Sequence, residues 1–167
     1  MKGFLWIVVR AALLALFGVA VGLGVNLVSP RGIPYVYVPP RVVDLAGVKA
    51  PLIDEKEALK YSNDDKTVFV DAREEKDFAE GRVKGAVNLP SAHKEEAFQR
   101  VEPLLPKEAR LILYCHGPDC RMAEKVGSLL AQLGYKDMMI MEAGYDAWEK
   151  AGYPVESDTR PASGGAK

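Results

Sequence analysis

Two cysteines stand five positions apart in a short loop, and they are the residues of this chain best suited to covalent chemistry. The apolar residues 111–114 precede the first of them, Cys115, and predict a β-strand that ends there. A loop with glycine and proline carries the second, Cys120, and leads into a segment with apolar residues at helical spacing. A thiol between a strand end and a helix N-terminus meets backbone amides and the positive end of the helix dipole. Both favour the thiolate form, so the pattern indicates nucleophilic sulfur chemistry at Cys115.

Other roles for these side chains stay open. A free cysteine at a strand end is often a buried, small apolar side chain without any chemistry. Cys120 could attack a persulfide or an oxidised sulfur on Cys115 and close a disulfide, which requires the two Cα atoms to lie within about 7 Å. The slightly favoured alternative is that Cys120 is a buried structural residue in the first turn of the helix after the loop. His116 either tunes the thiolate or faces solvent.

Length and composition limit the other function classes. The chain has 167 residues and a net charge of −1, which gives room for one domain with extensions and no basic patch for nucleic acid. Its two cysteines are too few for a disulfide scaffold. The only histidines, His93 and His116, show no metal-ligand spacing with them. We therefore expect no metal site, no cofactor and no nucleic-acid partner.

The amino-terminal residues differ in composition from the rest. Residues 11–28 carry no charge, and this length is at the lower limit for a membrane-spanning helix. Arg10 can extend toward the lipid headgroups and leave Trp6 at the interface. A cleaved signal peptide is the alternative, but its apolar core is usually shorter and ends in a small-x-small site. We therefore expect residues 1–28 to be an uncleaved membrane anchor.

The charges around this anchor predict its orientation. Lys2, Arg10 and the free amino group favour a cytoplasmic N-terminus, which places the rest of the chain outside the cytoplasm. Arg31 and Arg41 on the far side weaken the bias. In a Gram-negative bacterium the chain would be a single-pass inner-membrane protein with a periplasmic domain.

The remaining residues divide into three parts. Residues 29–41 contain four prolines and predict an extended linker, whereas residues 157–167 predict a disordered tail. Between them, residues 42–156 are expected to form one α/β domain, because strands alternate with helices and imply a mainly parallel sheet. Ligands of such sheets bind beyond the carboxyl ends of the strands, where Cys115 lies. The expected strands are residues 67–71, 86–89, 110–114 and 138–141, and the expected helices are residues 54–60, 74–80, 91–105, 123–133 and 144–150.

Three segments of this domain resemble the signatures of rhodanese-like domains. Residues 70–90, VDAREEKDFAEGRVKGAVNLP, are similar to the amino-terminal signature. Tyr114 and Cys115 with the following loop resemble the active-site segment, and residues 142–148, EAGYDAW, resemble the carboxyl-terminal signature. Together they cover about residues 50–155 in the right order and spacing.

The resemblance implies a three-layer fold with a five-stranded, mainly parallel sheet and a sulfurtransferase activity. Cys115 would take sulfane sulfur from thiosulfate, a polysulfide or a protein persulfide, hold it as a persulfide, and pass it to a thiol or cyanide. Asp71 and Arg73 would brace the neighbouring loops through an ion pair. We expect a monomer whose only other partner is the membrane. The loop residues around the persulfide anion would be His116, Gly117, Pro118, Asp119, Cys120 and Arg121.

This loop departs from the common rhodanese pattern, in which an arginine lies five positions after the cysteine. Here Arg121 lies six positions after Cys115, which is formally the Cys-x5-Arg pattern of phosphatases and arsenate reductases, whose arginine clamps an oxyanion. Pro118 has no amide hydrogen and Asp119 adds negative charge, and both disfavour that chemistry. The loop also matches a rhodanese subgroup with Cys-x-Gly-Pro-x-Cys. Sulfur transfer is the favoured interpretation, and non-catalytic sulfur carriage or binding is the other alternative.

Overall fold

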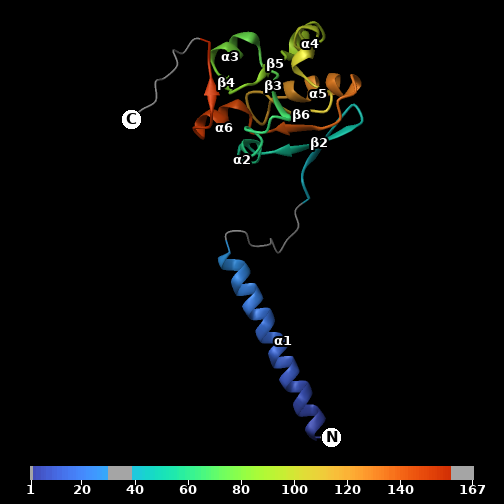
Figure 1. Ribbon diagram of the computed structural model, residues 1–167, viewed down its shortest axis with the longest axis vertical. Coiled ribbons are helices and arrows are strands. Elements are labelled where there is room, and N and C mark those ends of the chain that lie inside the picture. The colour runs from blue at the N-terminus through green and yellow to red at the C-terminus, as the bar shows by residue number, and fades with distance from the viewer. Residues whose placement is uncertain (1, 30–38, 159–167) are drawn as a thin grey trace, which may run out of the picture. The chain divides into compact units, whose positions relative to one another are not determined.

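The structure is a computed structural model that describes residues 2–29 and 39–158, and the chain divides into two units, Met1–Pro39 and Pro40–Lys167. The described residues of the first unit form the helix α1 (Lys2–Val28) (Figure 1). This helix is long and apolar enough to cross a membrane, and a signal sequence would share these properties. Most of the predicted linker and tail lie outside the described residues, so both stay predictions.

A six-stranded sheet forms the centre of the second unit, in the order β1-β2-β7-β6-β3-β5. The strands from β2 to β5 in this order are mutually parallel, and β1 joins one edge antiparallel to β2. This confirms the predicted α/β class and the five-stranded parallel sheet, to which β1 adds one strand. The strand bounds are β1 Val42–Leu45, β2 Val48–Ile53, β3 Thr67–Asp71, β5 Val87–Asn88, β6 Arg110–Tyr114 and β7 Met138–Met141.

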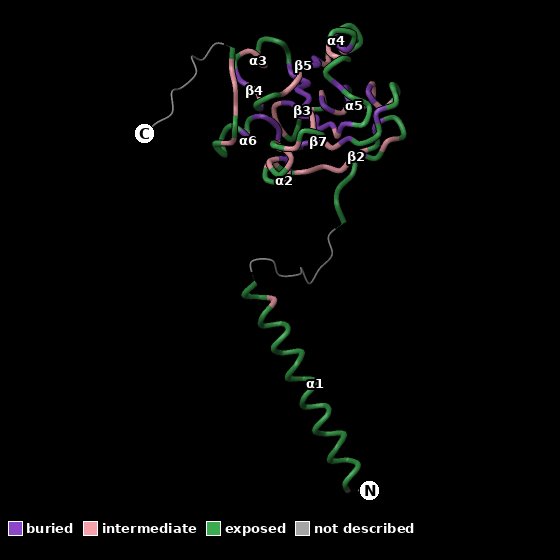
Figure 2. Tube along the Cα trace, in the orientation of Figure 1, coloured by how far each residue is buried: buried purple, intermediate pink, exposed green. Residues whose placement is uncertain are grey.

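Helices cover both faces of this sheet and make three layers. The central strand β6 shows the arrangement, because Leu111 and Leu113 belong to the core on one face, and Ile112 and Tyr114 to the core on the other. The first core includes residues of α4 and α5, and the second includes residues of α2 and α6. Figure 2 shows that the buried trace is concentrated at these strands and the helix faces beside them. The helix bounds are α2 Glu55–Leu59, α3 Glu75–Glu80, α4 Lys94–Val101, α5 Met122–Gln132 and α6 Gly144–Lys150.

The β1–β2 hairpin is an element that the sequence did not predict. Its two turn residues, Ala46 and Gly47, both have positive φ, at 51° and 95°. A two-residue turn of this kind is normally signalled by Asn-Gly or Asp-Gly, and alanine rarely adopts positive φ. The turn is supported by Asp44, whose Oδ1 accepts a 2.7 Å hydrogen bond from the amide of Gly47.

The helix predicted over residues 91–105 is broken into three pieces. A 3₁₀ turn at Ser91–His93 precedes α4, and another at Glu102–Leu104 follows it. Pro103 lies in the second turn and lacks the amide that a continuing α-helix would use. Pro90 is the N-cap of the first 3₁₀ turn and His93 that of α4, and neither side chain makes a capping hydrogen bond.

A short two-stranded sheet was also not predicted, and it ties the end of the domain to its middle. β4 (Arg82–Val83) pairs antiparallel with β8 (Val155–Glu156). Nε of Arg82 lies 2.8 Å from Glu156 Oε1, and Nη2 lies 2.8 Å from Asp158 Oδ1. Contacts of the domain therefore continue two residues beyond the boundary predicted at residue 156.

Candidate active site

Cys115 follows β6 at the carboxyl edge of the sheet, where its residue is 3% exposed. Its sulfur is bonded to that of Cys120 in a disulfide, and the two Cα atoms lie 6.3 Å apart. This separation satisfies the limit that the sequence analysis set for pairing. Helix α5 begins at Met122, so Cys120 lies ahead of the helix, half-buried, instead of in its first turn. The structure therefore describes the loop in its oxidised form.

The backbone of this oxidised loop is folded toward Cys115. The amide of Cys120 donates a 3.0 Å hydrogen bond to the carbonyl of Gly117 and closes a turn over Pro118 and Asp119. The carbonyl oxygen of Cys120 lies 3.2 Å from Sγ of Cys115. An oxygen lone pair at this place would repel a thiolate, whereas the sequence predicted amides around the sulfur. The carbonyl of Cys120 in this oxidised loop therefore does not stabilise an anion on Cys115.

The start of α6 holds the other side of the loop. The amides of Tyr145 and Asp146 donate hydrogen bonds of 2.8 and 3.2 Å to the carbonyls of Cys115 and His116. Gly144 has a φ of 71°, and a Cβ built there would overlap the carbonyl group of His116 and come within 2.6 Å of the Gly117 nitrogen. Only glycine lets the helix approach the loop this closely. The packing of α6 thus fixes where β6 ends and the loop begins.

Asp71 and Arg73 form the predicted ion pair at the end of β3, and they are 0% and 3% exposed. Nη2 of Arg73 lies 2.7 Å from Oδ2 of Asp71 and also donates a 2.6 Å hydrogen bond to the carbonyl of Gly81. The guanidinium carbon lies 4.1 Å from the ring centre of Tyr145. Burial alone would lower the pKa of Arg73, but the hydrogen bonds and charge of Asp71 raise it above its ordinary value. The pair links β3, the Gly81 turn and α6.

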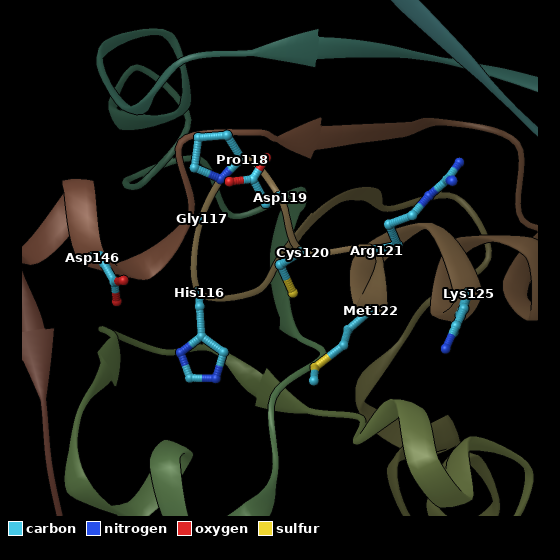
Figure 3. Close-up of a pocket in the computed structure, with 9 residues that line it drawn as sticks. All are labelled: His116, Gly117, Pro118, Asp119, Cys120, Arg121, Met122, Lys125 and Asp146. Carbon is cyan, nitrogen blue, oxygen red and sulfur yellow. The ribbon is translucent and has the colours of Figure 1, made fainter.

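Two cavities open beside the loop. The larger, of about 590 Å³, contains Cys120 on its wall but not Cys115, with Lys125 and Asp146 on further walls (Figure 3). It brings together all the predicted loop residues: His116, Gly117, Pro118, Asp119, Cys120 and Arg121. The second cavity, of about 330 Å³, is acidic, and Arg73, His116 and Tyr145 contribute to its wall. Its carboxylates are Asp77, Glu80, Asp146 and Glu149.

His116 and Arg121 both direct the polar ends of their side chains toward carboxylates instead of toward Cys115. Nε2 of His116 lies 3.3 Å from Oδ2 of Asp77, which favours pairing with that carboxylate over contact with the sulfur. The side chain of Arg121 is 79% exposed, and its guanidinium lies 3.2 Å from Glu124 on α5. Figure 3 shows it extended away from the loop. An arginine in this position does not clamp an oxyanion beside Cys115.

Three further residues at the site were not predicted from the sequence. Lys125 lies one helical turn after Arg121, and Asp146 lies within the carboxyl-terminal signature, so helical spacing and the signature could have indicated them. Glu142 lines a small cavity of about 40 Å³ together with both cysteines, and it pairs with Arg41 at the start of the domain. No local pattern signals that pairing, because it joins residues 101 positions apart.

Comparisons with known proteins identify the family of the domain. The family model for the rhodanese-like domain matches residues 54–151, more than half of the chain. The thiosulfate sulfurtransferase GlpE of Haemophilus influenzae is 31% identical over 91 residues, which cover 54% of this chain and 80% of that protein. The dual specificity phosphatase Cdc25 of Arabidopsis thaliana is 25% identical over 94 residues, covering 52% and 64% of the two chains.

A comparison with solved structures finds domains of the same family. The solution structure of the rhodanese-like domain of an Anabaena protein superposes with a TM-score of 0.54 at 21% identity, covering 70% of this chain and 88% of that one. This similarity shows the fold, and the match of the family model shows that the sequence is related as well. The chain belongs to the rhodanese-like domain family.

Proposed function

We propose that this protein is a sulfurtransferase that carries sulfane sulfur on Cys115 as a persulfide. The observation that supports this most directly is the position of Cys115, which directly follows the central strand β6 and begins a loop held by the amides of α6. Ligands of parallel sheets bind at this edge. The similarity to a thiosulfate sulfurtransferase supports the same chemistry.

The transfer takes place in two covalent steps once the loop is reduced. The Cys115 thiolate attacks the outer sulfur of the donor, the sulfur–sulfur bond of the donor breaks, and its remainder, sulfite in the case of thiosulfate, leaves with the electron pair. A thiolate or cyanide then attacks the outer sulfur of the persulfide, and Cys115 leaves as thiolate. The ammonium of Lys125 on the wall of the large cavity favours an anionic donor.

Two features of the loop argue against phosphatase or arsenate chemistry. The Arg121 guanidinium is paired with Glu124 instead of facing Cys115, and Asp119 adds negative charge to the cavity wall. A tetrahedral oxyanion needs the opposite arrangement, with cations and amides directed at one point. Sulfur transfer is therefore the function that the site supports best.

We expect Cys115→Ser to abolish sulfur loading completely, because the oxygen of serine does not form a persulfide. The full chain would be purified in detergent, reduced, freed of reductant, and treated with thiosulfate or polysulfide. Intact-mass spectrometry immediately after mixing would then show a gain of one sulfur atom, about 32 Da, in the wild type and none in the variant. Cyanide should remove this sulfur as thiocyanate.

The other outcomes separate the alternatives. A sulfur adduct that no acceptor removes would indicate a carrier or binding module without transferase activity. Hydrolysis of an aryl phosphate or reduction of arsenate without any adduct would reject sulfur transfer in favour of oxyanion chemistry.

We further propose that α1 is an uncleaved membrane anchor and that the domain is periplasmic in a bacterial inner membrane. The apolar length of the helix and the charges of Lys2 and Arg10 support this. The intact chain should stay in the membrane fraction after a high-salt wash and dissolve in detergent. A protease added to cells with a permeabilised outer membrane should digest the domain. A shortened, soluble chain would instead show that residues 1–28 are a signal peptide.

A further inference from the structure

We propose that Cys120 discharges the Cys115 persulfide as hydrosulfide and that the disulfide of this structure is the product of that step. The inference rests on the sulfur carriage proposed above and adds a second activity, the reductive release of sulfide. It assigns the loop two reactive thiols in place of one.

The step balances without an outside oxidant. The sulfur of Cys120 attacks Sγ of Cys115, a new bond forms between the two Sγ atoms, and the bond from Cys115 to the outer sulfur breaks. The outer sulfur takes the electron pair and the proton of the Cys120 thiol, and it leaves as HS⁻. The sulfane sulfur is thereby reduced to sulfide, while the two cysteine sulfurs are oxidised to the disulfide.

The loop brings the two sulfurs together through its own backbone. The hydrogen bond from the Cys120 amide to the Gly117 carbonyl turns the chain back, and the Cα atoms of the two cysteines lie 6.3 Å apart. Pro118 stands inside this turn and restricts the number of open conformations that the reduced loop can adopt. An attacking thiol held this close reacts as an intramolecular group, which gives it an advantage over thiols in solution.

Burial favours Cys120 as the attacking thiol. Cys115 is buried and does not line the large cavity, so an outside thiol has poor access to its Sγ. Cys120 lines both that cavity and the 40 Å³ cavity that it shares with Cys115. An attacking thiol can therefore reach the inner sulfur of the persulfide, Sγ of Cys115, mainly from the side of Cys120.

The difference in burial between the two cysteines also predicts how the disulfide is reduced back to two thiols. A dithiol reaches the sulfur of Cys120 in the large cavity, forms a mixed disulfide with it, and expels Cys115 as thiolate. The second thiol of the reductant then attacks its own sulfur in the mixed disulfide and releases Cys120. The partner that this cycle needs is therefore a dithiol reductant, and its covalent contact is Cys120.

Sulfide release from a loaded chain tests the first step. Reduced full-length protein in detergent would be loaded with thiosulfate, freed of excess donor, and followed with a sulfide-selective electrode without any acceptor. We expect the wild type to release one sulfide per persulfide and to lose the free thiol of Cys120 as the disulfide forms. Cys120→Ser and Cys120→Ala should both keep the adduct and release sulfide at least about tenfold more slowly than the wild type, with discharge to cyanide measured in parallel for each chain.

The outcomes distinguish the two proposals. If neither the wild type nor the variants take up sulfur, the proposed function fails, and this inference fails with it. If all three load and discharge to cyanide, but the variants release sulfide as fast as the wild type, only the role of Cys120 is overturned. Cyanide discharge by the variants also shows that their loops remain folded.

A monothiol tests the reset. Oxidised wild-type protein would be treated with 2-mercaptoethanol and then alkylated, and the two cysteines would be analysed by peptide mass spectrometry. We expect the mixed disulfide on Cys120 and the alkyl group on Cys115. The reverse pattern would overturn the assignment of Cys120 as the contact for the reductant.

Discussion

Replacing Arg73 with methionine is expected to lower the free energy of unfolding by about 3–5 kcal/mol. The side chains of Asp71 and Arg73 are almost completely inaccessible to solvent, and removing the guanidinium leaves a carboxylate without a counter-charge in the interior. The variant also loses the hydrogen bond to the Gly81 carbonyl and the contact with the Tyr145 ring. Because whole domains are stable by only about 5–15 kcal/mol, this one change removes a large part of the total.

Urea unfolding of the variant beside two controls would check this result. Arg100→Met breaks an ion pair with Glu75 in which both side chains are 59% exposed, so it should cost less than about 1 kcal/mol. Asp71→Asn in the Arg73→Met background removes the stranded charge and should recover part of the loss. A loss for Arg73→Met no larger than for Arg100→Met would contradict the bracing role of the pair.

Gly144→Ala is expected to slow sulfur loading by about a hundredfold or more. A methyl group there overlaps the carbonyl group of His116, so either the loop or the start of α6 must move. The hydrogen bond from the Tyr145 amide to the Cys115 carbonyl depends on this approach. A displacement of about 1 Å in a reacting group is enough to cause a loss of this size.

Gly152→Ala is the matched control for this prediction. Gly152 has a φ of 73°, close to the 71° of Gly144, but a Cβ built there meets no atom within 4 Å. Both variants therefore carry the same backbone strain, and only Gly144→Ala meets a steric clash. Loading rates would be measured by mass spectrometry, with thermal unfolding to compare stability. Equal loading rates in the two variants would show that the packing of α6 against the loop is not required.

Local patterns predicted the frame of the domain because the forces behind them are local. The apolar run of residues 67–71 is β3, and the helix expected to begin at residue 54 is capped by Asp54, whose Oδ1 accepts a 2.7 Å hydrogen bond from the Glu57 amide. The β1–β2 hairpin escaped prediction because Ala46 turns the chain there without a typical turn residue. Tertiary packing, which the sequence pattern does not encode, decided that element.

The site was predicted in its residues but not in its state. Cys115 and its loop could be located from the strand and the signatures, and Asp71 and Arg73 from the resemblance to the amino-terminal signature. The pairing of Cys120 depends on the distance between two Cα atoms, which the sequence does not fix. The sequence also did not fix that the Arg121 side chain points toward Glu124, although residues three positions apart lie on the same face of a helix.

The disulfide also couples the chemistry of the loop to the folding of the whole domain. A link between cysteines five positions apart restricts the unfolded chain, and for a ring of this size the restriction is worth roughly 2 kcal/mol. Thermodynamic linkage is reciprocal, so folding protects the disulfide from reduction by as much as the disulfide protects the fold from melting. A substitution far from the loop that destabilises the domain would therefore weaken the protection of the disulfide from reduction only if it also frees the loop. The heat resistance of the protein becomes a readout of the redox state of its surroundings.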